Sequence, residues 1–130
     1  MPQKSVWVFF YGSFIDLDVL KRADVFVEQF EVARLSGFDV EIKPLANLVR
    51  SEQHCIYGIV AATTHQELRG LYSQGWVSSY LPEAVLVETL DGKWRAALCY
   101  VAPELAAEPP AEEYVENIVR AARRYGFPDW

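Results

Sequence analysis

The sequence has few of the features that mark nucleic-acid-binding or membrane proteins. Its net charge is −6, and its densest basic group is the short set Arg120, Arg123 and Arg124. It therefore lacks the lysine and arginine footprint that neutralises phosphates. No apolar run approaches the ~20 residues of a membrane helix, and residues 1–4 show no basic-then-apolar signal pattern. We expect a cytoplasmic protein that has neither nucleic acid nor a membrane as its partner.

Cysteine and histidine are scarce, with two of each. Cys55 and Cys99 both lie in apolar runs, where cysteine usually behaves as a small core residue. No Cys-x-x-Cys or paired His/Cys spacing is present, and His54 and His65 are isolated. The sequence therefore predicts no metal site and no cofactor.

The composition is that of a folded globule. Hydrophobic residues make up 52% of the chain, aromatic residues 14% and charged residues 23%. A chain of 130 residues is in the size range of one domain with one core. We expect residues 1–130 to form a single domain.

Runs rich in β-branched and aromatic residues predict the strands. A glycine turn at Ser36-Gly37 predicts two paired strands on either side of it, and Asp91-Gly92 predicts a tight hairpin. Ala46 to Val49 forms a separate short extended piece in this interpretation. The predicted strands are residues 5–11, 25–34, 38–42, 54–61, 84–90 and 93–101.

Two helices are predicted with clear boundaries, and residues 15–22 form a short helical or irregular segment. Thr64 and Glu67 have the spacing of a capping box, so we expect a helix from Thr64 that stops at Gly75. The second helix repeats apolar residues at four-residue steps from Tyr114 to Tyr125. Acidic residues near its start and arginines near its end suit the helix dipole.

The most chemical-looking segment is Tyr11-Gly12-Ser13-Phe14, directly after the first predicted strand. A glycine beyond a buried strand lets backbone N–H groups converge on an anion or a carbonyl group. An ordinary strand-ending turn has the same composition. The residues alone leave both interpretations open.

Three stretches in order carry a family resemblance. Phe9 to Phe14 reads PhePheTyrGlySerPhe. Residues 56–80 contain IleTyrGlyIleVal, LeuArgGlyLeuTyrSerGlnGly and then Tyr80. Residues 114–130 begin TyrValGluAsnIle and continue to TyrGlyPhePro. These resemble, in turn, the Phe-x-Tyr-Gly-Ser-Asn loop, the Val-x-Gly-x-Leu and Leu-x-x-Leu-Asp-x-x-Glu-Gly block and the C-terminal Tyr-x-x-x-Ile pattern of the gamma-glutamylcyclotransferase family, which includes AIG2-like proteins and gamma-glutamylamine cyclotransferases.

This resemblance implies an α+β fold: a small mixed β-barrel with flanking helices and one cavity at the barrel mouth. In the family the Tyr-Gly-Ser loop holds a gamma-glutamyl group while a glutamate takes a proton from the α-amino nitrogen. That nitrogen attacks the gamma-carbonyl, which yields 5-oxoproline and releases an amine or amino acid. No cofactor is implied. The implied substrate-binding residues are Phe9, Phe10, Tyr11, Gly12, Ser13, Phe14, Tyr80 and Tyr114.

Gln74 stands where the family carries its catalytic glutamate, when Gly75 is matched to the family glycine. An amide cannot accept the ammonium proton, and loss of a general base typically costs ~10²–10⁴-fold in rate. The same stretch has Leu71-Tyr72-Ser73 in place of the usual Leu-Asp and is one residue shorter than the family pattern, and no Glu-Gly pair occurs elsewhere in the chain. Phe14 also replaces the more familiar asparagine.

Three hypotheses follow. The chain is a cyclotransferase in which Glu83 or Glu67 replaces the missing base, or it is an inactive relative that binds a small gamma-glutamyl-like ligand. A purely structural interaction protein, the third hypothesis, predicts a collapsed cavity with side chains filling the space beside Tyr11 to Phe14. The sequence leaves open whether the chain is a monomer or a homodimer, and which amine is released.

Overall fold

A computed structural model describes residues 6–42, 45–73, 77, 80–102 and 111–127 of the chain. No helix among these residues is long and apolar enough to cross a membrane. The elements in chain order are β1 (Val6–Phe10), the 3-10 helix η1 (Gly12–Ile15), α1 (Leu17–Arg22), β2 (Phe30–Ile42), β3 (Ala46–Thr63), α2 (His65–Leu71), β4 (Leu81–Thr89), β5 (Trp94–Val101) and α3 (Glu112–Arg124).

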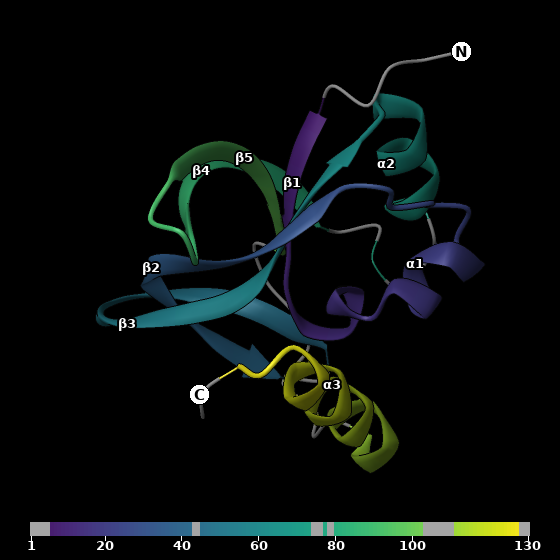
Figure 1. Ribbon diagram of the computed structural model, residues 1–130. Helices are drawn as coiled ribbons and strands as arrows, with labels where there is room; N and C mark the ends of the chain where they lie inside the picture. The colour runs from purple at the N-terminus through teal and green to yellow at the C-terminus, as the bar shows by residue number, and fades with distance from the viewer. Residues whose placement is uncertain (1–5, 43–44, 74–76, 78–79, 103–110, 128–130) are drawn as a thin grey trace.

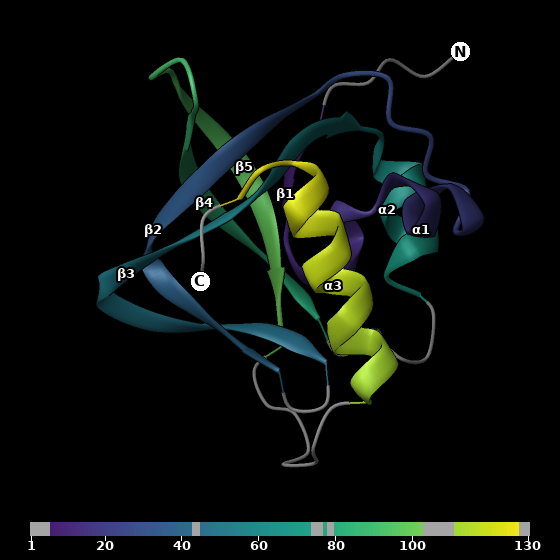
Figure 2. The same cartoon turned by 60° about the horizontal axis from the view of Figure 1, so that its bottom comes forward.

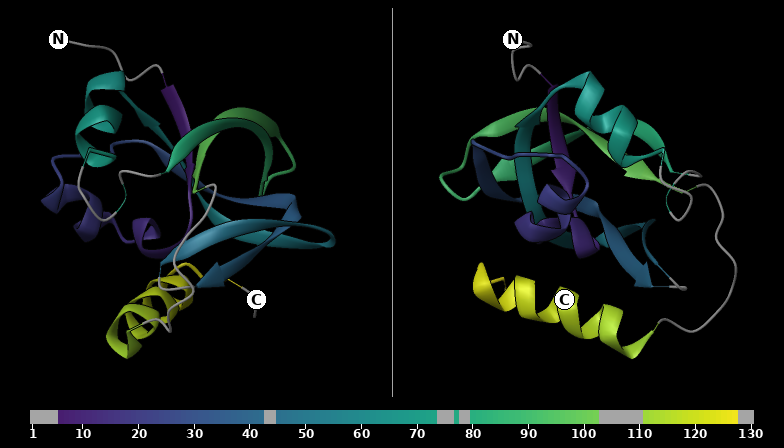
Figure 3. Two further views of the ribbon diagram at one scale, coloured as in Figure 1. Left: turned by 180° about the vertical axis from the view of Figure 1, so that it is seen from behind. Right: turned by 90° about the vertical axis from the view of Figure 1, so that its right-hand side faces the viewer.

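The strands form a closed barrel in the order β1-β3-β2-β4-β5 (Figure 1). Four of the five strand pairings are antiparallel, including the one between β2 and β4. The fifth is parallel: β1 runs beside β5, with Val8 opposite Leu98. The sheet is therefore mixed. The α2 helix lies toward one end of the barrel and α3 toward the opposite end, as the views in Figures 1 and 3 agree. The predicted α+β fold, a small mixed barrel with flanking helices, is confirmed.

The prediction of a turn at Ser36-Gly37 is wrong. Phe30–Ile42 is one strand, and the pairing register with β3 shifts between Ser36 and Phe38. Gly37 has a φ of 88° at this irregularity, so the glycine marks a bulge rather than a reversal of the chain. The local glycine signal could not show that β3 is long enough to pair on both sides of the bulge. The short piece at Ala46 to Val49 is accordingly the start of β3 and not a separate element.

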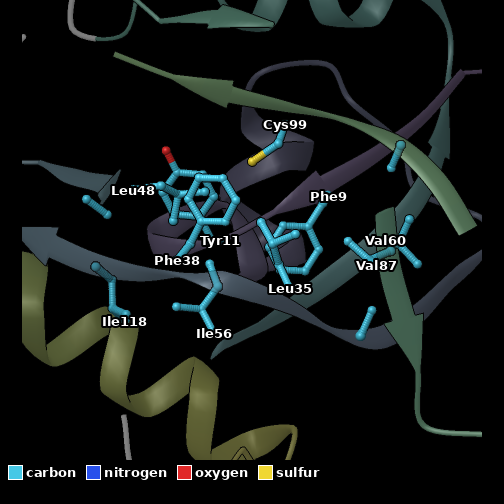
Figure 4. Close-up of a cluster of buried hydrophobic side chains, with 13 residues drawn as sticks. Phe9, Tyr11, Leu35, Phe38, Leu48, Ile56, Val60, Val87, Cys99 and Ile118 are labelled. Atoms are coloured by element: carbon cyan, nitrogen blue, oxygen red, sulfur yellow. The ribbon is translucent and has the colours of Figure 1, made fainter. Parts of the chain in front are cut away.

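The side chains of β1 alternate between two cores, which explains why the strand reads as a continuous apolar run. Phe9 and the following Tyr11 point into the barrel, where they meet Leu35, Cys99 and other buried residues (Figure 4). Ile118 of α3 joins this cluster and closes that end of the barrel. Val8 and Phe10 belong instead to a second cluster that packs against α1 and α2.

The helix predictions hold in kind but not at every boundary. The capping box is present: Glu67 N–H donates to the Thr64 hydroxyl at 3.0 Å, and Thr64 N–H donates to the Glu67 carboxylate at 3.1 Å. The α2 helix ends at Leu71, earlier than predicted, and Gly75 lies outside the described residues. Cys99 is fully buried as expected, whereas Cys55, opposite Ser36 where the register of β2 and β3 begins to shift, is only half-buried.

Candidate functional site

The loop after β1 is shaped by a contact that only glycine permits. Gly12 has a φ of 63°, and a β-carbon added to it would lie 2.5 Å from the Cβ of Ala46. L-residues other than glycine rarely adopt that backbone conformation, and two carbons pack no closer than about 3.5 Å. The loop backbone therefore lies directly against the first residue of β3, and Tyr11, Ser13 and Phe14 are placed around that contact.

Ala46 is held from both sides by tyrosines. Its N–H donates to the Tyr114 hydroxyl of α3 at 2.9 Å, and its carbonyl oxygen accepts from the Tyr80 hydroxyl. Because these are backbone groups of a buried residue, each would be costly to leave unpaired. The arrangement fixes two tyrosines predicted from the sequence, on distant parts of the chain, next to the Gly12 loop. Nothing in the sequence pattern pointed to Ala46.

A small cavity lies at this meeting point. The structure thus brings together five predicted site residues, Tyr11, Ser13, Phe14, Tyr80 and Tyr114, and adds four that the sequence analysis missed. The volume of this tyrosine cavity is about 20 Å³, which is room for roughly one water molecule. The described residues that line it are Tyr11, Ser13, Phe14, Ala46, Tyr72, Val77, Tyr80, Tyr100 and Tyr114.

Phe9 and Phe10 do not line the cavity. Phe9 is buried inside the barrel and Phe10 packs in the second core cluster, so both support the loop from β1. Gly12 contributes backbone beside Ala46. Gln74, the residue at the position of the family glutamate, lies outside the described residues.

Tyr72 is the missed residue with the largest effect on the cavity. Its ring stacks on Tyr100 with centroids 3.8 Å apart and planes 8° apart. Phe14 meets the Tyr72 ring edge-on at 5.7 Å. Tyr72 follows the last residue of α2, and it stands near the position of the family's aspartate, so the departure from Leu-Asp was the available sequence signal. Tyr100 had no comparable signal.

Burial raises the pKa of every tyrosine around the cavity. The pKa values of Tyr11, Tyr72 and Tyr80 are raised most strongly, first by burial and then by neighbouring ionisable groups. Burial also raises the pKa of Tyr100 and of Tyr114, although the hydrogen bond from Ala46 N–H opposes the shift at Tyr114. These phenols consequently stay protonated at neutral pH and act as hydrogen-bonding groups rather than as bases.

Neither acid proposed as a substitute base lines the cavity. Glu67 uses both carboxylate oxygens locally, one in the capping box and one as acceptor of the Phe26 N–H at 3.0 Å. Glu83 accepts a hydrogen bond from Arg50 at 2.6 Å. Their use as bases remains an untested prediction, but each would first have to leave these partners. In the described part of the chain, no group of three or more His, Cys, Asp or Glu residues is placed to hold a metal ion.

The overall fold is shared with solved structures. An uncharacterised human protein superposes with a TM-score of 0.81 at 24% identity, covering 97% of this chain and 83% of the other. A gamma-glutamyl cyclotransferase follows with a TM-score of 0.78 at 22% identity, covering 95% and 81%. An AIG2-like protein from Mus musculus has a TM-score of 0.63 at 18% identity, covering 85% and 82%.

These likenesses establish the fold, and it is the fold of gamma-glutamylcyclotransferases and AIG2-like proteins that the three sequence stretches predicted. No protein-family model matches the chain. No curated protein matches it either.

Proposed function

We propose that this chain binds a small gamma-glutamyl compound beside the Tyr11 to Phe14 loop without cyclising it at an enzymatic rate. The observation that carries the proposal is the set of ionisable groups around the cavity. Among the described lining residues, every ionisable side chain is a tyrosine whose pKa is raised by burial. The described part of the cavity wall therefore offers donors and acceptors of hydrogen bonds but no group that takes a proton at neutral pH.

Cyclisation requires such a group. The α-ammonium of a gamma-glutamyl compound must lose a proton before its nitrogen can attack the gamma-carbonyl. A new C–N bond then forms, the original amide C–N bond breaks, and the departing amine takes up a proton. A positioned base typically contributes ~10²–10⁴-fold to the rate of such a reaction. By the family resemblance, the residue at the position of that base is Gln74, whose amide can hydrogen-bond an ammonium but cannot deprotonate it.

The same cavity suits the binding step. Ser13 and the phenol hydroxyls supply polar partners, and the face of Tyr100, once Tyr72 has moved off it, is an electron-rich surface that attracts an ammonium group. Ala46, Tyr80 and Tyr114 hold one another through the two hydrogen bonds described above. A site held in this way loses little side-chain freedom when a ligand enters.

The size of the cavity sets a condition on binding. A volume of about 20 Å³ holds a water but not a gamma-glutamyl group, so the ligand enters only when a lining side chain moves. We expect that side chain to be Tyr72, because its ring stacks on Tyr100 and covers that part of the cavity wall. An aromatic pair is worth about 0.5–1.5 kcal/mol beyond its buried area, which corresponds to a loss of affinity of up to about tenfold. That cost is compatible with binding.

The same filled cavity favours a second candidate, a structural interaction protein that uses the fold without a ligand. Tyr72 stacked on Tyr100 and edge-on to Phe14 is the side-chain filling that this hypothesis predicts. The enzyme hypothesis has less support, because Glu67 and Glu83 are both engaged elsewhere. A binding measurement and an activity measurement together separate the three hypotheses.

The test uses the full chain, gamma-glutamylethylamide as the probe, calorimetry for binding and release of 5-oxoproline for activity. Gln74→Glu restores the family residue, and Gln66→Glu, on the exposed side of α2, is the control that adds the same charge. We expect the wild type to bind without turnover and Gln74→Glu alone to release 5-oxoproline.

Turnover by the wild type would contradict the proposal, and Glu83→Gln and Glu67→Gln would then identify the acid in use. Absence of binding by both wild type and Gln74→Glu would reject it in favour of the interaction protein.

A further inference from the structure

A second and larger cavity, here called the outer cavity, adjoins the tyrosine cavity. It has a volume of about 200 Å³ and is lined by Ser13, Asp16, Val19, Leu45, Tyr114 and Asn117. Figures 1 and 3 show η1, the helical turn that follows β1, lying next to α3. The Tyr125 hydroxyl, just after α3, donates a hydrogen bond to the Ile15 carbonyl of η1 at 2.8 Å. Figure 2 shows α3 along its length on the near side of the molecule, and its packing partner among the elements after β1 is η1.

The outer cavity combines apolar wall residues with a single negatively charged side chain. Val19, Leu45 and the ring of Tyr114 supply aliphatic and aromatic surface, and Asp16 is the charged residue among the lining side chains. The volume is similar to the ~150 Å³ of a cavity that accepts benzene. A small molecule with an apolar body and one polar end therefore fits it.

The carboxylate of Asp16 has acceptor capacity to spare. It is the N-cap of α1, and its Oδ1 accepts the Asp18 N–H at 3.0 Å. An ionised carboxylate offers about four lone-pair positions, so one backbone hydrogen bond leaves the others for a ligand. Within the described residues, no lysine or arginine forms an ion pair with Asp16. A cationic ligand would supply the missing positive charge, and an anion would be repelled.

We infer that the outer cavity is a binding site for primary alkylamines, with the ammonium group at the Asp16 carboxylate and the alkyl chain along Val19 and Leu45. An alkylammonium donates up to three hydrogen bonds, and Ser13, Asn117 and the Tyr114 hydroxyl stand near as neutral polar partners. Amino acids are poorer ligands, because their α-carboxylate would enter the same cavity as the carboxylate of Asp16.

The site adjoins the tyrosine cavity through shared walls. Ser13 and Tyr114 line both cavities. On the proposed function, a single molecule lies across this boundary, with its gamma-glutamyl group on the tyrosine side and its amine portion on the Asp16 side. This extension rests on the proposed function, whereas binding of a free alkylamine does not. In such a molecule, the amine portion should have an apolar chain, a second ammonium group at the end far from the amide and no carboxylate, because that end lies at Asp16.

The test follows backbone NMR signals of the full chain during titration with n-butylammonium at neutral pH. Asp16→Asn removes the charge and keeps a good N-cap, since asparagine caps helices as well as aspartate. Asp18→Asn is the matched control, because it removes the same charge two residues away from an exposed position outside the cavity lining. Butanoate, with a similar chain and the opposite charge, is the control ligand.

We expect saturable shifts at Ser13, Val19, Leu45 and Asn117 in the wild type, unchanged affinity in Asp18→Asn, and no binding of butanoate. A charge-assisted hydrogen bond is worth enough that Asp16→Asn should bind about tenfold to a hundredfold more weakly. Equal affinities of the two variants, or no saturable binding by the wild type, would overturn the inference. If n-butylammonium binds and gamma-glutamylethylamide, whose amine portion has no carboxylate, does not, the alkylamine site stands and the proposed function falls. The opposite result rejects the site alone.

Discussion

The α-carbon of Gly12 occupies a place beside Ala46 in which no side chain fits. An added β-carbon would lie 2.5 Å from the Cβ of Ala46, and the φ of 63° already disfavours other residues. This one contact holds the loop after β1 against the first residue of β3. It links the most chemical-looking part of the sequence to a residue with no chemical function of its own.

Gly12→Ala is therefore expected to destabilise the fold by about 2–5 kcal/mol, the sum of left-handed backbone strain and overpacking. Gly37→Ala is the control, because Gly37 has a φ of 88° but nothing within 4 Å of an added β-carbon. It should cost only the backbone part, about 1–2 kcal/mol. Urea unfolding measures both. Adding Ala46→Gly to Gly12→Ala should recover the overpacking part, and equal costs for the two single variants would refute the contact.

Tyr114→Phe removes the hydroxyl that accepts the Ala46 N–H at 2.9 Å. A buried donor left unpaired costs about 1–3 kcal/mol, so the free energy of unfolding should fall by that amount. Hydrogen exchange provides the specific readout, because the Ala46 amide should exchange faster in the variant. Val60, in the interior of the same strand, should respond only to the fall in global stability, so its exchange should change less than that of Ala46. Unchanged protection of Ala46 would show that the hydrogen bond does not hold this residue.

Tyr72→Leu removes the stack on Tyr100 while keeping an apolar side chain in place. On the proposed function, a ligand no longer has to displace the stacked ring, so the affinity for gamma-glutamylethylamide should rise by up to about tenfold. Calorimetry on wild type and variant measures the change. The stability should fall, because a buried aromatic side chain is replaced by a smaller one. A lower affinity in the variant would mean that Tyr72 is part of the ligand's contact surface instead of an obstacle.

Alkaline pH should destabilise the protein. Burial raises the pKa of the Cys99 thiol to about 12 from an ordinary value near 9, with Glu83 as a second cause. A raised pKa means that the unfolded chain loses this proton first. The stabilising contribution is therefore complete below pH ~9 and declines as the pH rises toward the folded pKa. The buried tyrosines, whose pKa values are also raised, act in the same direction.

Each proton lost by the unfolded chain alone lowers the free energy of unfolding by about 1.4 kcal/mol per pH unit. Urea unfolding between pH 8 and pH 11 measures the slope. Cys99→Ala should reduce the slope between pH 9 and pH 10 whatever its effect at pH 8. A slope that is the same in wild type and variant would contradict the burial of Cys99.

The sequence predicted much of the site because its residues stand in short local motifs. Tyr11, Ser13 and Phe14 follow a strand, and Tyr80 and Tyr114 lie in stretches that resemble one family. The structure brings these five together around one cavity. Their role in binding stays a prediction. Tyr100 and Ala46 could not be found in this way, since each joins the site through contacts with residues far away in the chain.

What the sequence determined by itself was the set of elements with local signals: the strand before Gly12, the capping box at Thr64, the hairpin at Asp91-Gly92 and the amphipathic C-terminal helix. Local propensity and capping act within a few residues, so they can be read from the chain. The tertiary structure alone decided that the glycine at position 37 is a bulge within one long strand, because that depends on pairing with β3. It alone decided that Tyr72 fills the cavity and that Asp16 faces a second one, because packing between distant elements sets the shape of both spaces.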